Sequence, residues 1–145
     1  MRIEVATDID ASPATVWAVL EPVESHVEWM ADAVRITFRS DRRRGVGTEF
    51  ECLTRVGPIS TTDVMTVTEW EPEAVMGIEH RGVVVGRGRF TLSPLAVQRT
   101  RFRWEEELYF PGWMGGRLGE IAAKPILTRL WLGNLRRLRS RVEAA

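Results

Sequence analysis

Alternating apolar and polar positions predict that most of this chain forms β-strands. Ile3, Val5, Thr7 and Ile9 share one face of the first strand. Further segments alternate or are rich in Val, Thr and aromatic residues, and turn residues separate them. These segments are residues 34–39, 48–55, 59–70, 75–80, 83–93 and 100–110. The last six strands therefore follow one another in series and predict an antiparallel meander.

Two short helices are expected between the first strand and this series. Ser12 is a candidate N-cap, and Pro13 suits the first helical position. Pro22 ends this helix, and residues 23–30 predict a second one.

A long helix is expected at the C-terminus, after a glycine-rich hinge at residues 112–119, and ends near Val142. Pro125 should kink it or separate its first turns, because proline lacks a backbone donor. Its apolar side comprises Leu127, Leu130, Trp131, Leu135, Leu138 and Val142. The order of elements predicts an α+β fold, a single domain over residues 1–145, in which the sheet curls around the long helix and leaves a hollow.

The register of the last hairpin follows from charge. Placing Arg89 opposite Glu105 also places Arg87 opposite Glu107, and both pairs attract. The neighbouring register places Arg89 opposite Arg103, which repels. On the concave face the favoured register pairs Gly86 with Leu108, Gly88 with Glu106, Phe90 with Trp104, and Leu92 with Phe102.

Gly86 and Gly88 are costly in a strand, so they indicate a bend, room for a ligand, or both. Glu106 points inward among aromatic residues unless a bulge intervenes. It then makes a structural hydrogen bond, or it serves as a polar anchor or acid/base for a bound molecule. The cavity lining is expected to comprise Phe50, Met76, Ile78, Gly86, Gly88, Phe90, Phe102, Trp104, Glu106, Leu108, Leu127 and Trp131.

A pairing of Glu106 with His80 would be an economical acid/base dyad. The short turn after His80 suggests that His80 faces Val84 and that Met76 faces Gly88. These pairings put the two polar residues in rows about 13 Å apart. We therefore expect Glu106 to act alone or with a group from the C-terminal helix.

Several segments, in their order and spacing, resemble the START-like helix-grip superfamily (SRPBCC), specifically its bacterial polyketide cyclase/dehydrase and lipid-transport group. They are residues 11–17, Trp29, and residues 45–50, 67–72, 89–94, 100–104 and 134–138. The resemblance covers nearly the whole chain and implies the same fold. The superfamily includes carriers, cyclases, hydrolases and regulatory binders, so it implies no single function, and no catalytic motif carries over.

Composition excludes several classes of protein. Basic and acidic residues number 20 each, so no net charge favours nucleic acid. Residues 113–145 nevertheless carry a net charge of +5. This indicates either a solvated helix face or a docking surface for anionic lipid or a partner. No apolar run approaches the roughly 18 residues of a membrane span, and the N-terminus lacks the pattern of a signal peptide.

Cys52 is the one cysteine, so it forms no internal disulfide and is expected to be an inert core residue in a reducing compartment. His26 and His80 would need carboxylates to complete a metal site, and no ligand spacing suggests one. We expect no metal, no cofactor and a cytoplasmic location.

The leading hypothesis is a binding or carrier protein for an apolar or aromatic small molecule of lipid, polyketide or quinone type. The first alternative is a cyclase/dehydrase-type enzyme that uses Glu106. The second is a regulatory module that acts through the basic C-terminal helix, with weak contact to anionic membrane.

Overall fold

A computed structural model describes all 145 residues and shows one seven-stranded antiparallel sheet with the order β1-β7-β6-β5-β4-β3-β2. The strands are β1 (Arg2–Ile9), β2 (Ala33–Phe38), β3 (Glu49–Val56), β4 (Ile59–Glu71), β5 (Val75–Arg81), β6 (Val85–Ala96) and β7 (Arg99–Tyr109). The helices are α1 (Pro13–Leu20), the 3₁₀ helices η1 (Val23–Glu28) and η2 (Gly112–Met114), and the long α2 (Gly116–Glu143). The predicted helix-grip architecture is confirmed.

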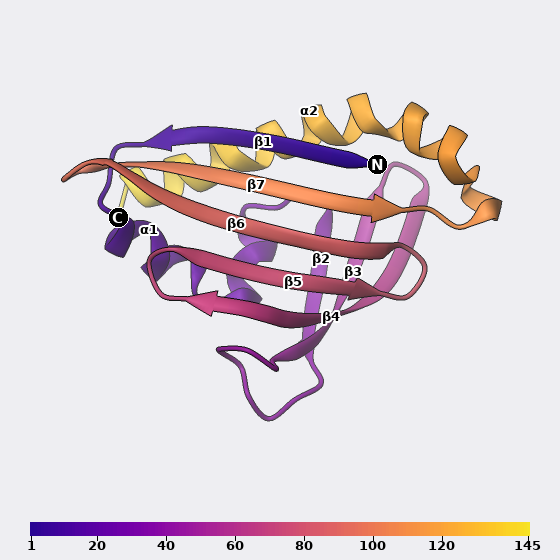
Figure 1. Cartoon of the computed structure of the whole chain (residues 1–145), viewed down its shortest axis with the longest axis horizontal. Helices are drawn as coiled ribbons and strands as arrows, with labels where there is room; N and C mark the ends of the chain where they lie inside the picture. Colours follow the sequence, from indigo (N-terminus) through magenta and orange to yellow (C-terminus); the bar gives the residue numbers. More distant parts are fainter.

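The sheet is strongly curved. In Figure 1, β1, β7, β6 and β5 run side by side, whereas β2 and β3 cross steeply behind them, and α2 extends along the sheet beside β1. A bulge between Val67 and Glu69 interrupts the pairing of β4 with β5. Bulges bend and twist a strand, so this one contributes to the curvature.

The short helices begin where the sequence predicts. Pro13 opens α1, and the Ser12 side chain accepts a hydrogen bond from the backbone N–H of Thr15 at 3.3 Å. The second helix is a single 3₁₀ segment, Val23–Glu28.

The predicted glycine hinge is wrong. Residues 112–119 form the 3₁₀ helix η2, a left-handed Gly115 with φ of 89°, and the first turn of α2. Only glycine adopts that φ without strain. Pro125 does not separate the first turns either, because α2 continues through it; the ribbon curves where its orange turns meet the yellow ones (Figure 1).

Side chains fill the space beneath the second half of α2. The buried residues of this helix begin at Leu127, and Leu135 and Leu138 are fully buried. Trp131 stacks on Trp104 of β7, with ring centroids 4.5 Å apart and planes at 15°. No residue of α2 before Leu127 is buried, and the hollow lies beneath this part of the helix.

The register predicted for β6 and β7 is confirmed, but the one predicted for β5 and β6 is wrong. His80 faces Gly86 rather than Val84, and Ile78 rather than Met76 faces Gly88. The loop is longer than expected because Asp63 of β4 holds it open. Its carboxylate accepts hydrogen bonds from the backbone N–H groups of Val83 and Val84, at 2.8 and 3.3 Å. The pairing therefore shifts by two residues.

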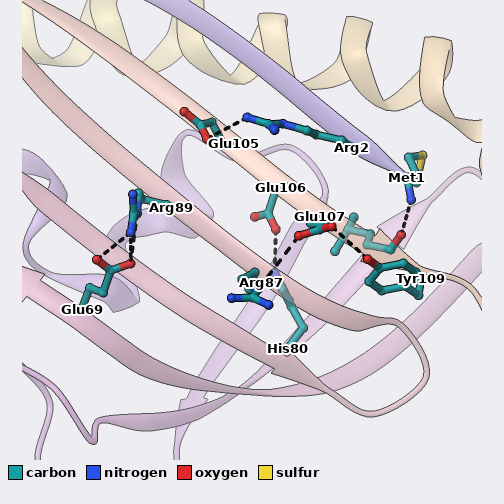
Figure 2. Close-up of polar contacts among 11 residues, drawn as sticks. Met1, Arg2, Glu69, His80, Arg87, Arg89, Glu105, Glu106, Glu107 and Tyr109 are labelled. Atoms are coloured by element: carbon teal, nitrogen blue, oxygen red, sulfur yellow. Dashed lines mark hydrogen bonds and ion pairs between the residues drawn. The ribbon is translucent and has the colours of Figure 1, made fainter.

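On the outer face, the register of β6 with β7 is as predicted, but only one of the two predicted ion pairs forms. Arg87 lies 4.0 Å from Glu107. Arg89 instead makes a two-pronged pair with Glu69 of β4, with contacts of 2.8 Å, while Glu105 is bonded by Arg2 (Figure 2). Gly77 of β5 lies between Glu69 and Arg89. It leaves room for the Glu69 carboxylate, because a Cβ on Gly77 would lie 2.8 Å from a Glu69 carboxylate oxygen.

Candidate functional site

A cavity of about 470 Å³ lies between the concave face of the sheet, η1 and the first half of α2. Of the 32 residues that border it, 21 are hydrophobic. Small-molecule sites in proteins have volumes of about 300–1,000 Å³ and mostly apolar walls with a few polar groups. The hollow therefore has the size and chemistry of a site for an apolar small molecule.

Most residues predicted to line the cavity border it: Phe50, Met76, Ile78, Gly88, Phe90, Trp104, Glu106, Leu108, Leu127 and Trp131. Two do not. Phe102 is fully buried in an aromatic cluster with Trp29 and Phe90. Gly86, with φ of 145°, lies against the backbone of β7, where an added Cβ would meet the Glu107 carbonyl oxygen at 1.8 Å.

Apart from Phe50, the wall on the side of η1 and β2–β4 was not predicted from the sequence. This wall includes Val23, His26, Met30, Asp32, Ile36, Cys52, Thr54, Val56, Asp63 and Met65. The alternation in β3 was a signal for part of it, since Phe50, Cys52, Thr54 and Val56 share one face. Burial raises the pKa of the Cys52 thiol to about 11, which fits an inert wall residue.

Glu106 is the buried carboxylate of the sheet wall, and it has two side-chain partners. One oxygen accepts a hydrogen bond from Trp104 Nε1 at 3.0 Å. The other bonds His80 Nε2 at 2.8 Å (Figure 2). The predicted separation of about 13 Å between the His80 and Glu106 rows was therefore wrong. The shift of β5 places the row of His80 two residues from the row of Glu106 instead of four, and the two long side chains bridge that diagonal.

Gly88 makes this contact possible. It lies on β6, between Glu106 on β7 and His80 on β5. A Cβ at Gly88 would lie only 2.3–2.5 Å from the carboxylate atoms of Glu106. The Glu106 carboxylate thus occupies the space above Gly88. The interpretation that Gly88 leaves room for a ligand is therefore wrong.

The charge state of His80 depends on Glu106. Burial opposes the charged imidazolium, but the negative charge and hydrogen bond of Glu106, with a smaller effect from Asp63, outweigh it and hold the pKa of His80 above its ordinary value. The other ring nitrogen, Nδ1, has no partner within the protein. It is not sealed in the core, because the one fully buried side-chain nitrogen or oxygen without a partner is Trp29 Nε1.

A second buried carboxylate, Asp32, joins the wall to α2. Its oxygens accept hydrogen bonds from Trp131 Nε1 at 3.2 Å and Asn134 Nδ2 at 2.8 Å. The Asn134 amide oxygen accepts in turn from the backbone N–H of Ala31 at 3.0 Å. Both carboxylate oxygens are engaged by donors of the helix, so this cluster fixes α2 on the sheet.

The cavity opens between the β3–β4 turn and the first half of α2. Ile59 and Ile126 border the hollow and are 47% and 59% exposed. Ile59 and Ile126 therefore place exposed apolar side chains at the mouth. Trp113 of η2 and Leu118 and Ile121 of α2 are also exposed but do not border the cavity.

The basic residues of α2 divide into two groups. Near the C-terminus, Arg137, Arg139 and Arg141 bond the Trp29 carbonyl, Glu143 and Glu28 within the protein. The rest, Arg117, Lys124, Arg129 and Arg136, make no ion pair.

Comparisons with known proteins agree with the fold. The sequence matches the model of the polyketide cyclase/dehydrase and lipid transport family over residues 1–143, and the chain belongs to this family. That description names activities on hydrophobic small molecules. No curated protein matches the sequence.

Solved structures share the fold at low sequence identity. The protein TTHA0849 from Thermus thermophilus aligns with a TM-score of 0.81 and 17% identity, over 99% of this chain and 98% of its own. The Zhui aromatase/cyclase from a Streptomyces species gives 0.79 and 14%, over 99% and 93%. A START superfamily protein from Mycobacterium smegmatis gives 0.67 and 14%, over 99% and 94%.

None of the helices is both long and apolar enough to cross a bilayer.

Proposed function

We propose that this protein binds or carries an apolar or aromatic small molecule, of lipid, polyketide or quinone type, in the cavity beneath α2. The observation that carries the proposal is the mostly apolar cavity of about 470 Å³. A void of this size in a protein interior forfeits packing contacts along its whole wall. A bound apolar molecule would restore them.

Native mass spectrometry of the purified protein tests this proposal first, by looking for a co-purified small molecule. Titration with an apolar fluorescent dye tests it independently, and we expect a dissociation constant of about micromolar order, within reach of a buried drug-sized ligand. Absence of both a co-purified molecule and dye binding would contradict it.

A cavity-filling variant locates the ligand. Ile78 borders the hollow in the middle of β5, so Ile78→Trp should occupy the space and abolish dye binding. Ile121→Trp is the matched control, because Ile121 is 63% exposed and does not border the cavity. Gly88→Leu, which the sequence alone would favour as the filling variant, would displace Glu106 instead.

A cyclase/dehydrase-type enzyme is the second candidate, in which Glu106 moves protons on the bound molecule. The contact with His80 favours it, because a carboxylate and an imidazole form an acid/base pair. A carrier returns its ligand unchanged, whereas an enzyme returns it with an altered mass. Mass spectrometry of the ligand before and after incubation therefore separates the two candidates.

A weak contact with anionic membrane is a further part of the proposal. The exposed apolar residues Leu118, Ile121 and Ile126 lie in the same half of α2 as Arg117 and Lys124, which make no ion pair. Apolar and basic groups together are typical of segments that rest on an anionic lipid surface.

A further inference from the structure

We propose that His80 and Glu106 form a proton-accepting dyad, and that the cavity takes an apolar body carrying one weakly acidic hydroxyl group, a phenol or an enol. The inference rests on the proposed ligand-binding function and specifies which ligands the cavity prefers.

The first step is the tautomer of His80. Its Nε2 lies 2.8 Å from the Glu106 carboxylate, which only accepts, so Nε2 carries a hydrogen. In the neutral ring, Nδ1 then has a free lone pair. His80 borders the cavity and its side chain is 10% exposed. In the proposed dyad, Nδ1 is the basic atom that the sheet wall offers to a ligand.

The second step is the support behind this base. Trp104 Nε1 holds the other Glu106 oxygen at 3.0 Å, so the carboxylate cannot rotate away without losing a buried hydrogen bond. Gly88 provides the space in which the carboxylate lies. A base oriented by a second group that is itself held in place is the arrangement that proton transfer requires.

The third step is the chemistry. The O–H bond of the ligand breaks, a bond forms between that hydrogen and Nδ1, and the electron pair stays on the ligand oxygen. The resulting imidazolium lies between the new oxyanion and the Glu106 carboxylate. No oxidant, reductant or metal takes part, and the complex has the same net charge before and after the transfer.

The charged surroundings favour this transfer. Glu106 on β7 and Asp63 on β4 are the acidic groups that act on His80, and both favour its protonated form. Gly86, opposite His80 on β6, and Gly88, two residues along the same strand, carry no charge. The cavity-facing residues of α2 are apolar, namely Ala123, Ile126, Leu127 and Trp131. Elsewhere among the residues that border the cavity, His26, Asp32, Cys52 and Arg89 are the other titratable groups, and the Arg89 guanidinium is paired with Glu69.

The class of ligand follows from the walls. An apolar cavity with a basic group on its wall discriminates between two molecules of equal shape when only one carries an acidic hydroxyl, because the basic group is left unpaired by the other. A carboxylic acid would already be ionised in water and would bring the same oxyanion at a larger desolvation cost. A phenol or enol enters neutral and ionises inside.

The experiment compares a nitronaphthol with the nitronaphthalene that lacks its hydroxyl group, because ionisation of the nitronaphthol shifts its visible absorption. At a pH above the raised pKa of His80, where the ring of the free protein is neutral, and below the pKa of the free probe, we expect the wild-type protein to bind the nitronaphthol about tenfold more tightly than the nitronaphthalene or better, the ratio that one charge-assisted hydrogen bond supplies. The bound probe should show the absorption of its ionised form.

Two variants and a control assign the effect. His80→Phe should abolish both the preference and the ionised band. Glu106→Gln keeps the shape of the side chain and should weaken both. Glu105→Gln, one residue away on the exposed outer face, should leave both unchanged. Nitrogen NMR of wild-type His80 gives a readout that needs no variant, because Nδ1 should gain a proton when the nitronaphthol binds and not when the nitronaphthalene does.

Equal binding of the two probes without an ionised band overturns the dyad and leaves the proposed apolar site intact. Binding of neither probe overturns both. Retention of the preference in His80→Phe would also overturn the inference.

Discussion

The two histidines of this chain border the same cavity and titrate in opposite directions. His26, in η1, bonds the backbone carbonyl of Leu20 through Nε2 at 2.8 Å, and burial lowers its pKa to about 4. His80, in β5, bonds a carboxylate at the same distance, and its pKa is raised.

The difference lies in the partner and not in the degree of burial. A carbonyl oxygen accepts one hydrogen bond from a neutral ring but brings no charge to offset the desolvation of an imidazolium. A carboxylate brings that charge. Within one apolar wall, the protein therefore keeps one imidazole neutral for packing, against Trp29 and Phe90, and keeps the other ready to hold a proton.

The largest expected effect is an acid-dependent loss of stability caused by His26. Because its pKa falls from 6.5 in the unfolded chain to about 4 in the folded one, its stabilising contribution is present above pH 6.5 and is lost as the pH falls toward 4. The loss amounts to about 3 kcal/mol over that interval. Urea unfolding as a function of pH measures it.

His26→Gln is the control for this prediction, since glutamine retains a donor for the Leu20 carbonyl but does not titrate. The difference between wild type and variant should shrink as the pH falls from 6.5 toward 4. A difference that stays constant over this range would show that His26 is not the group responsible.

Gly88→Ala should break the contact between His80 and the Glu106 carboxylate. The new Cβ would lie 2.3–2.5 Å from the Glu106 carboxylate, so we expect a cost of about 2 kcal/mol and a lowered pKa of His80. Gly133→Ala, in α2, is the matched control. Its Cβ would have no neighbour closer than 3.6 Å, and the helix should gain about 0.5–1 kcal/mol. Equal effects of the two substitutions in urea unfolding would contradict this account.

Glu106→Gln sharpens the comparison without changing shape. Removal of the carboxylate charge leaves burial as the dominant influence, so the pKa of His80 should fall below its ordinary value and come to resemble that of His26. NMR titration of the ring measures this. In the wild type, the stability that His80 contributes is fully present below pH 6.5 and is lost as the pH rises through its raised pKa; the variant should lack this alkaline loss. An unchanged titration of His80 would exclude Glu106 as the cause.

The smallest expected effect concerns the mouth of the cavity. Sedimentation with anionic vesicles at low salt should show weak binding, since each basic residue near the surface contributes about 1 kcal/mol. Lys124→Gln should reduce it, whereas Arg139→Gln, whose wild-type side chain is already paired with Glu143, should not. No sedimentation with anionic vesicles at low salt would end this proposal.

Local sequence patterns determined the elements and one register. Alternation placed the seven strands, Ser12 and Pro13 placed α1, and the opposed charges of Arg87 and Glu107 paired β6 with β7 correctly. These predictions succeed because each rests on neighbouring residues or on one hairpin. The same reasoning found most of the cavity wall on β5–β7. The register of β6 with β7 was correct, and the two-residue shift of β5 leaves the same residues on the concave face.

Tertiary structure alone decided the chemistry of the site. The loop between β5 and β6 takes its length from Asp63, which lies about 20 residues earlier in the chain, on another strand. That contact shifts the register by two residues and brings His80 to Glu106. The role of Gly88, as the space for a carboxylate from the next strand, likewise depends on three strands at once. A sequence records which residues are present, but a distance of 2.8 Å between two side chains 26 residues apart follows only when every strand between them has its place.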